Sequence, residues 1–219
     1  CRAFLFFSYP SKMSGDTIWT GGLTRYLTDG TAYACGNGVV DGFSGATPLV
    51  HAGQGIQGLE SAGISFMDLF IGNIGGAVGE TSVIAILLGA ILLIWTGVAS
   101  WKIMLSSVIG ALAIGFLANA LGTTPYLQLP AWYHLVLGGF AFGTVFMATD
   151  PVTSAQTETG KWIYGFLVGA LTVTVRLFNP GYMEGMMLAI LLMNTFAPLI
   201  DHYVVEVSLK RKARKVKIA

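Results

Sequence analysis

Charge is scarce in this sequence of 219 residues. Only 11% of the residues are charged and 54% are hydrophobic, whereas an ordinary soluble domain has roughly 25% charged residues. So few charges cannot cover the surface of a soluble domain, which excludes a soluble enzyme. The large apolar content equally excludes a disordered chain. The formal net charge of +1 conceals an uneven distribution of charge along the chain.

Cysteine and histidine are also rare. The two cysteines, Cys1 and Cys35, form no Cys-x-x-Cys pair, so this chain alone cannot ligate an iron–sulfur cluster. The three histidines lack the spacing of metal ligands, and we expect no metal site. A phosphate-binding P-loop and a Gly-x-Ser-x-Gly nucleophile elbow are missing too, which argues against a hydrolase.

Long apolar runs, by contrast, are abundant. A helix needs about 20 mostly apolar residues to cross a bilayer. The sequence therefore predicts an all-α polytopic membrane protein, built as a bundle of transmembrane helices. Residues Cys1–Tyr9 resemble the end of a preceding span, so we expect the chain to be a piece of a longer protein. The five full candidates are Ser82–Ser100, Ile103–Leu121, Trp132–Ala148, Trp162–Phe178 and Tyr182–Ile200.

A polar, glycine-rich loop, Pro10–Thr81, separates the partial span from the five candidates. Its later part, Ser65–Glu80, is apolar but short and interrupted by glycines, which predicts a re-entrant or interfacial segment. Glycines such as Gly110, Gly165 and Gly169 fall inside the candidate spans. We expect most of the 29 glycines to allow close packing of helices.

Lysine and arginine predict the orientation, because cytoplasmic loops carry an excess of both. Six of the twelve lie in Lys210–Lys217, within a basic tail (residues 201–219) that we place in the cytoplasm. Alternating back through five spans puts Lys102 and Lys161 on the same side and the long polar loop outside, with Arg176 at the outer end of its span. Beside a membrane helix, the tail indicates stop-transfer and contact with anionic lipid, not a nucleic-acid site.

Four acidic residues near membrane depth suggest a cation path, because charges there are costly. Asp150 precedes Pro151, which cannot continue a helical hydrogen-bond ladder and leaves carbonyls free. A carboxylate with free carbonyls suits a small hard cation. Each acid also has an ordinary interpretation as a helix end or cap at the water interface. The ion-path candidates are Asp150, Asp201, Glu184 and Glu80.

The segment Asp41–Leu49 has the sequence DGFSGATPL. By itself it predicts a flexible turn in which small neighbours leave the Thr47 hydroxyl accessible. Pro48 favours an extended conformation at Thr47. Backbone N–H groups of residues 44–47 could also cradle a phosphate.

Ser-Gly-Ala-Thr, residues 44–47, resembles the flavinylation motif of a family of membrane proteins. That family includes the B subunit of the sodium-pumping NADH:quinone oxidoreductase and the D subunit of the Rnf ferredoxin:NAD oxidoreductase. Asp-Pro-Val-Thr-Ser and Ala-Pro-Leu-Ile-Asp are similar to both, so the D subunit stays the alternative. Further segments resemble the B subunit and extend the similarity over essentially the whole chain: Phe7–Trp19, Trp132–Ser154, Glu184–Asn194 and Phe196–Val205.

The resemblance implies that a flavin transferase outside the cytoplasm esterifies FMN through its phosphate to Thr47. The neighbouring Asp41, Ser44, Gly45 and Ala46 would surround the attachment point. Thr47 would be an anchor, not a catalyst. The charge-based orientation independently places Thr47 on the outer side, where the transferase works.

The implied fold is the second half of an inverted-repeat bundle of about ten spans. The implied function is that of a translocase subunit in a bacterial inner membrane, passing electrons from NADH toward ubiquinone and exporting Na⁺. Its partners would be the other subunits, including a second subunit with covalent FMN. Riboflavin and ubiquinone sites would draw on the missing N-terminal half. A flavin-free transporter or channel is the alternative from another class, because transporters also use inverted repeats with broken helices.

Overall fold

A computed structural model describes residues 8, 18–20, 43–45, 48–53, 55–61, 63–72, 81–122, 127–178 and 185–218. Within these ranges the chain is helical, apart from two three-residue strands that pair antiparallel. The strands are β1 (Ile18–Thr20) and β2 (Phe43–Gly45). The helices are α3 (Pro48–Ala52), α4 (Ile56–Ser61), α5 (Phe66–Ile71), α6 (Val83–Trp95), α7 (Trp101–Leu121), α8 (Tyr133–Val136), α9 (Phe140–Phe142), the π-helical turn η1 (Gly143–Met147), α10 (Glu158–Phe178) and α11 (Gly185–Ile218). The predicted helical fold class is confirmed.

Three helices in the described part of the chain are long and apolar enough to cross a membrane. They are α7, α10 and the Gly185–Ala213 portion of α11, while α6 is apolar but only 13 residues long. Large apolar side chains on α6 are exposed, with 65% of Leu88 and 89% of Trp95 accessible. Such a surface suits lipid or a neighbouring membrane protein, as expected of a membrane subunit.

The segment expected as the span Ser82–Ser100 contains the shorter helix α6. Ser82 caps its first turn through its side-chain oxygen. At the other end, the hydroxyl of Thr96 donates to two carbonyls of the preceding turn, and Gly97 has a φ of 71°. A left-handed glycine is a common helix terminator, so α6 ends at Trp95 for a local reason.

The segment expected as the span Trp132–Ala148 is an interrupted helix. Its first part, α8, ends at Val136, and the chain becomes helical again only at Phe140. Between them Gly138 has a φ of 62°, a conformation that L side chains rarely adopt. The glycine pair that follows Leu137 therefore divides this apolar run into two short helical pieces.

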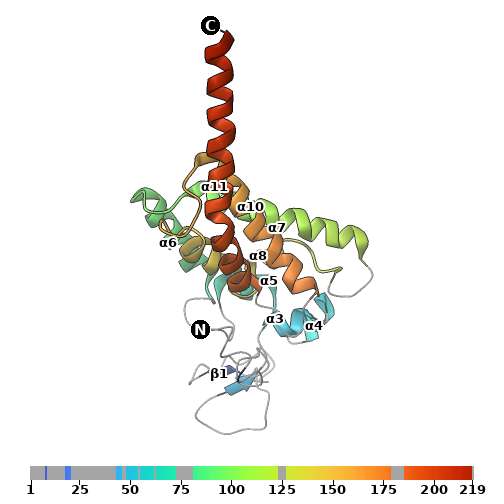
Figure 1. The fold of residues 1–219 in the computed structure, drawn as a ribbon. Coiled ribbons are helices and arrows are strands. Elements are labelled where there is room, and N and C mark those ends of the chain that lie inside the picture. The colour runs from blue at the N-terminus through green and yellow to red at the C-terminus, as the bar shows by residue number, and fades with distance from the viewer. Residues whose placement is uncertain are drawn as a thin grey trace.

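Helix α11 does not end at Ile200, where the apolar run ends, but continues to Ile218 with Pro198 inside it. Lysine, arginine and alanine are good helix formers, and Lys210 lies 2.6 Å from the Glu206 carboxylate one turn earlier. Most of the predicted basic tail is thus helical. In Figure 1 this half of α11 projects beyond the rest of the molecule.

Helices α7 and α10 pack closely along their length. A Cβ added at Gly169 would collide with the carbonyl oxygen of Ser107, and one added at Gly110 with the carbonyl oxygen of Phe166. The backbones approach too closely for any side chain at these positions. At this contact the prediction that glycines serve helix packing is confirmed.

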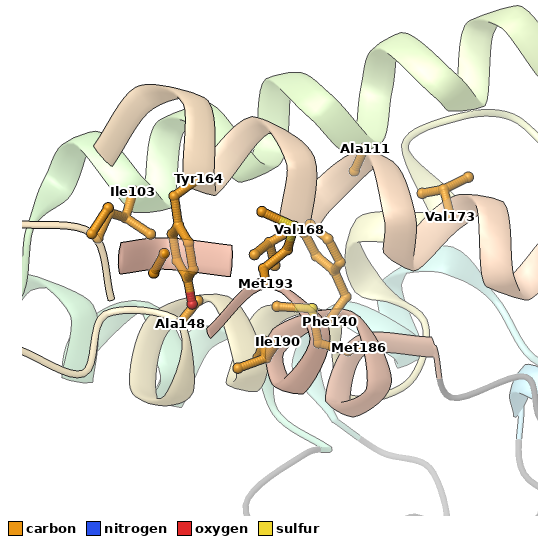
Figure 2. Packing of buried hydrophobic residues seen from close by; sticks show 12 residues of the cluster. Ile103, Ala111, Phe140, Ala148, Tyr164, Val168, Val173, Met186, Ile190 and Met193 are labelled. Atoms are coloured by element: carbon orange, nitrogen blue, oxygen red, sulfur yellow. The ribbon is translucent and has the colours of Figure 1, made fainter. Parts of the chain in front are cut away.

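Two apolar clusters hold the helices together. The main cluster joins α7, α9, α10 and α11, and Figure 2 shows Phe140 close to Val168 in it, with the Tyr164 ring extending toward Ala148. The second cluster joins the short helices α3, α4 and α5 to α8. Its buried members are Leu49, Ala52, Leu59, Leu69, Val83, Leu129, Val136 and Leu137.

Candidate functional site

The predicted ion-path residue Asp201 caps the N-terminus of α10 from outside that helix. Its Oδ2 accepts a hydrogen bond from the Gln156 N–H at 2.7 Å. Its Oδ1 accepts from the N–H and the hydroxyl of Thr157, at 3.0 and 2.6 Å. The first N–H groups of a helix lack intrahelical partners and carry a partial positive charge, so a carboxylate is favourable there. We call this region the Asp201 end of α10.

Gln156 joins Asp201 to the loop that carries Asp150. The side-chain amide of Gln156 donates to the carbonyl oxygens of Pro151 and Ser154, at 2.7 and 3.0 Å. The N–H of Ser154 in turn donates to the backbone carbonyl of Asp150 at 3.2 Å. The structure therefore brings the two predicted acids into one hydrogen-bonded network.

The carboxylate of Asp150 lies in a tight turn and is partly exposed. It accepts a hydrogen bond from the Thr153 hydroxyl at 2.7 Å and another from the Val152 N–H at 3.3 Å. The Thr153 bond and then the Val152 bond hold the pKa of Asp150 below its ordinary value, because both favour the charged form. Asp150 is thus an ionised carboxylate within reach of water at neutral pH.

Gly160, in the first turn of α10, makes room for this network. A Cβ at Gly160 would lie 2.6 Å from Oδ1 of Asp201 and would also collide with the Thr157 hydroxyl. Its N–H donates to that hydroxyl at 3.1 Å. The carboxylate can therefore approach the helix end only because this position has no side chain.

Two lysines used to predict the orientation lie at the same end. Lys161 lies 3.0 Å from the Glu158 carboxylate, and Lys102, at the start of α7, pairs with the other oxygen of that carboxylate. Helix α11 runs antiparallel to α10. Asp201 contacts the start of α10, whereas Asn194, two turns earlier on α11, accepts a hydrogen bond from Tyr164, two turns later on α10. The basic residues of α11 therefore continue outward from the Asp201 end (Figure 1).

Across the described ranges, no group of three His, Cys, Asp or Glu side chains is placed to hold a metal ion. The Asp201 end instead offers two carboxylates and a loop rich in carbonyl oxygens. These are hard oxygen ligands of the kind that a small cation uses.

The opposite end of α10 contains a buried arginine. Arg176 is only 1% exposed. Its Nη1 donates to the carbonyl oxygen of His134 at 2.8 Å, and its Nη2 donates to that of Leu137 at 2.9 Å. Both carbonyls belong to the end of α8, where the helix is interrupted. We call this region the Arg176 end of α10.

The second cluster places α3 near the Arg176 end, because Leu49 and Ala52 of α3 share that cluster with Leu137. Helix α10 has 21 residues, so the two ends are about 30 Å apart. In Figure 1, α3 accordingly lies in the lower part of the molecule and the C-terminus at the top.

The predicted attachment segment is only partly within the described residues. Backbone pairing places Ser44 opposite Trp19 and Gly45 opposite Ile18, so the expected turn contains a short strand. Helix α3 begins at Pro48, a residue well suited to the first helical position. Outside the described residues, and therefore still predictions, are Thr47, Asp41, Ala46, Glu80 and Glu184.

Sequence reasoning missed the roles of Arg176, Gln156 and Thr157. Arg176 entered the prediction only as a charge that marks a helix end. A signal was available, because a lone arginine in an apolar run must find partners or leave the membrane. No such signal marks Gln156 or Thr157, whose partner lies on another helix.

Comparison with known proteins identifies the family of this chain. Residues 1–210 match the model of the NQR2, RnfD, RnfE family. The chain is 48% identical over 219 residues to the B subunit of the Na(+)-translocating NADH-quinone reductase of Ectopseudomonas mendocina. It is 47% identical over 219 residues to that of Azotobacter vinelandii, and 46% identical over 218 residues to that of Haemophilus influenzae. These alignments cover 96–98% of the chain but only 49–50% of each relative, so the chain spans about half their length.

Proposed function

Because the chain belongs to the NQR2, RnfD, RnfE family, we propose that it forms about half of the B subunit of a Na⁺-translocating NADH:quinone reductase. The observation that carries this proposal is 46–48% identity, over nearly the whole chain, to B subunits of such enzymes. The enzyme would lie in a bacterial inner membrane, and this chain would contribute one half of an inverted-repeat bundle. The D subunit of an Rnf complex is the second candidate, because the family model includes it.

In the proposed orientation, the Asp201 end of α10 faces the cytoplasm. Lys102, Lys161 and the basic part of α11 gather at that end, and cytoplasmic segments are enriched in lysine and arginine. Helix α3, which follows Thr47 directly, lies toward the opposite end. This arrangement supports an extracytoplasmic Thr47, on the side where a flavin transferase would act.

The residues next to Thr47 suit a covalently held FMN. Pro48 and Leu49, directly after it, are buried, so α3 is anchored in the second cluster immediately beyond the attachment point. We propose that the Thr47 hydroxyl oxygen holds the FMN phosphate as an ester, surrounded by Asp41, Ser44, Gly45 and Ala46. When bound, the flavin supplies redox chemistry that protein side chains lack, while the chain holds and orients it.

The proposed partners follow from the same family membership. They are the other subunits of the complex, among them a second subunit with covalent FMN, and the flavin transferase. Ubiquinone and riboflavin would bind partly to the remainder of the B subunit. Electrons would pass from NADH through these partners toward ubiquinone.

For Na⁺, the proposed cytoplasmic entrance is the Asp201 end. Asp150 is ionised and partly exposed, so it can contact an arriving cation. Asp201 adds a negative charge while its oxygens accept bonds from Gln156 and Thr157. Glu184 and Glu80 are the weaker candidates for the ion path.

The decisive test is mass spectrometry of the peptide that contains Thr47. The complete complex would be isolated from a host that also makes the flavin transferase. We expect the peptide to gain the mass of FMN through a phosphoester, and the denatured subunit to stay yellow and fluorescent. Thr47→Ala should abolish both signals, whereas Ser61→Ala, a hydroxyl deletion on α4 outside the attachment segment, should keep the covalent flavin.

A colourless, unmodified protein from that host would overturn the proposal and favour a flavin-free transporter or channel. If the peptide carries FMN, the Rnf alternative is separated by activity. The proposed complex should reduce ubiquinone with NADH in a Na⁺-dependent manner. Ferredoxin-dependent reduction of NAD⁺ without quinone reduction would instead identify the Rnf protein.

A further inference from the structure

The free-energy cost of burying the Arg176 guanidinium has to be offset by strong local interactions. Arg176 is 1% exposed, and a charged side chain within a membrane segment costs roughly 2.5–3.5 kcal/mol on insertion scales. Its contacts with the carbonyls of His134 and Leu137 are both short hydrogen bonds from a charged donor. The arginine is therefore held in one position and holds its partners in turn.

Those partners are carbonyls that α8 cannot satisfy itself. The helix stops because Gly138 turns the chain with a φ of 62°, so the last carbonyls lack the N–H donors of a following turn. The C-terminus of a helix also carries a partial negative charge. The planar fork of an arginine matches two adjacent carbonyls in a way that a lysine ammonium does not. Arg176 thus replaces the hydrogen-bond ladder at the interruption.

The end of α8 and helix α3 belong to the same apolar cluster. The side chains of Val136 and Leu137 are buried in the second cluster together with Leu49 and Ala52 of α3. Helix α5 also packs against α8, because the ring of Phe66 lies edge-on to that of Tyr133, with the ring centroids 5.3 Å apart. A continuous path of packed groups therefore leads from Arg176 through α8 to the helix that begins just after Thr47.

We propose that Arg176 is a positioning residue for the attachment segment. By holding the interrupted end of α8, it fixes α3, the helix that begins directly after Thr47 in the sequence. The link to flavin rests on the proposed function, whereas the link from Arg176 to α3 does not. The two links can therefore be tested separately.

The test compares Arg176→Met with Val173→Ala in the complete complex. Val173 is a matched control, because it is fully buried on α10 one turn earlier but belongs to the main cluster. Hydrogen–deuterium exchange would be followed in peptides covering residues 48–52 and 133–137. We expect Arg176→Met to speed exchange at least tenfold in both peptides, and Val173→Ala to leave residues 48–52 unchanged.

The flavin readout completes the test. Covalent flavin per protein should fall at least threefold in Arg176→Met and recover in part in Arg176→Lys, which retains the charge. Unchanged exchange at residues 48–52 in Arg176→Met would overturn the proposal. If Arg176→Met cannot be recovered from membranes, hydrogen–deuterium exchange at residues 48–52 would be compared between Arg176→Lys and Val173→Ala instead. Unchanged exchange there in Arg176→Lys would then overturn the proposal. A wild-type protein without flavin would refute the proposed function only, because the exchange experiment needs no flavin.

Discussion

The two ends of α10 solve the same physical problem with opposite charges. At the Asp201 end, an anionic side chain of α11 caps the N–H groups at the start of α10. At the Arg176 end, a cationic side chain of α10 caps the carbonyls at the end of α8. Both pairs complement a helix dipole across two elements. They differ in burial, because Asp201 is partly exposed and Arg176 is enclosed.

That difference in burial decides how easily each charged group can exchange its partners. A charge near water can exchange its partners for ions or solvent at little cost. A buried charge cannot, because losing its partner leaves an uncompensated group in a medium of low dielectric constant. This contrast agrees with the two proposed roles, a cation entrance at the Asp201 end and the positioning of α3 at the Arg176 end.

The largest expected loss of unfolding free energy comes from removing the buried hydrogen bonds at the Arg176 end. Arg176→Met leaves the carbonyls of His134 and Leu137 buried without their charged donor. At about 1–3 kcal/mol for each unsatisfied acceptor, it should lower the unfolding free energy by about 2–6 kcal/mol. Lys161→Met is the matched deletion of a cation at the other end and should cost much less, because Lys161 pairs with an exposed carboxylate. Denaturant unfolding in detergent would measure both. Equal losses for the two variants would contradict the contrast in burial.

A smaller loss of unfolding free energy is expected from adding a side chain at Gly160, at the Asp201 end. Gly160→Ala places a methyl group against Asp201 and Thr157 and should cost about 1–3 kcal/mol. Asp201→Ala removes the cap and should cost about 1 kcal/mol. Because both changes disrupt one contact, the double variant should lose less than the sum. Strict additivity in the same unfolding assay would show that Gly160 does not make room for Asp201.

The comparison also shows how far the sequence predicts this molecule. The helices α7, α10 and α11 were predictable, because a long apolar run is a local property. The interruption before Phe140 was not, since glycines in an apolar run equally indicate close packing. Arg176 and Asp201 have partners 39–45 residues away, a separation that no local pattern encodes.

Some residues of the candidate site were likewise predictable from the sequence, and others stay predictions. A shared role for Asp150 and Asp201 was predicted from charge and depth, and the structure joins them through Gln156. Asp201 was expected at the inner end of its own span, but it lies inside α11 and caps the start of α10 instead. The attachment residue Thr47 was identified by a resemblance to a motif, and its role remains a prediction, as do those of Glu80 and Glu184.

The smallest expected change in stability, with a specific change in function, comes from the exposed Asp150. Asp150→Ala should leave the fold intact and weaken the Na⁺ activation of quinone reduction severalfold, because it removes an ionised carboxylate from the proposed entrance. Thr153→Ala is the control that keeps the carboxylate but deletes its strongest hydrogen bond. Since that bond lowers the pKa of Asp150, the control should behave like the wild type at pH 7.

At lower pH, the Na⁺ activation of Thr153→Ala should differ from that of the wild type. As the pH falls, Asp150 in Thr153→Ala takes up its proton at a higher pH than in the wild type, so its Na⁺ activation should fade earlier. Steady-state rates over a range of Na⁺ concentrations and pH values would show this order. Unchanged Na⁺ activation in Asp150→Ala would remove Asp150 from the ion path and leave the Asp201 end as a structural cap alone.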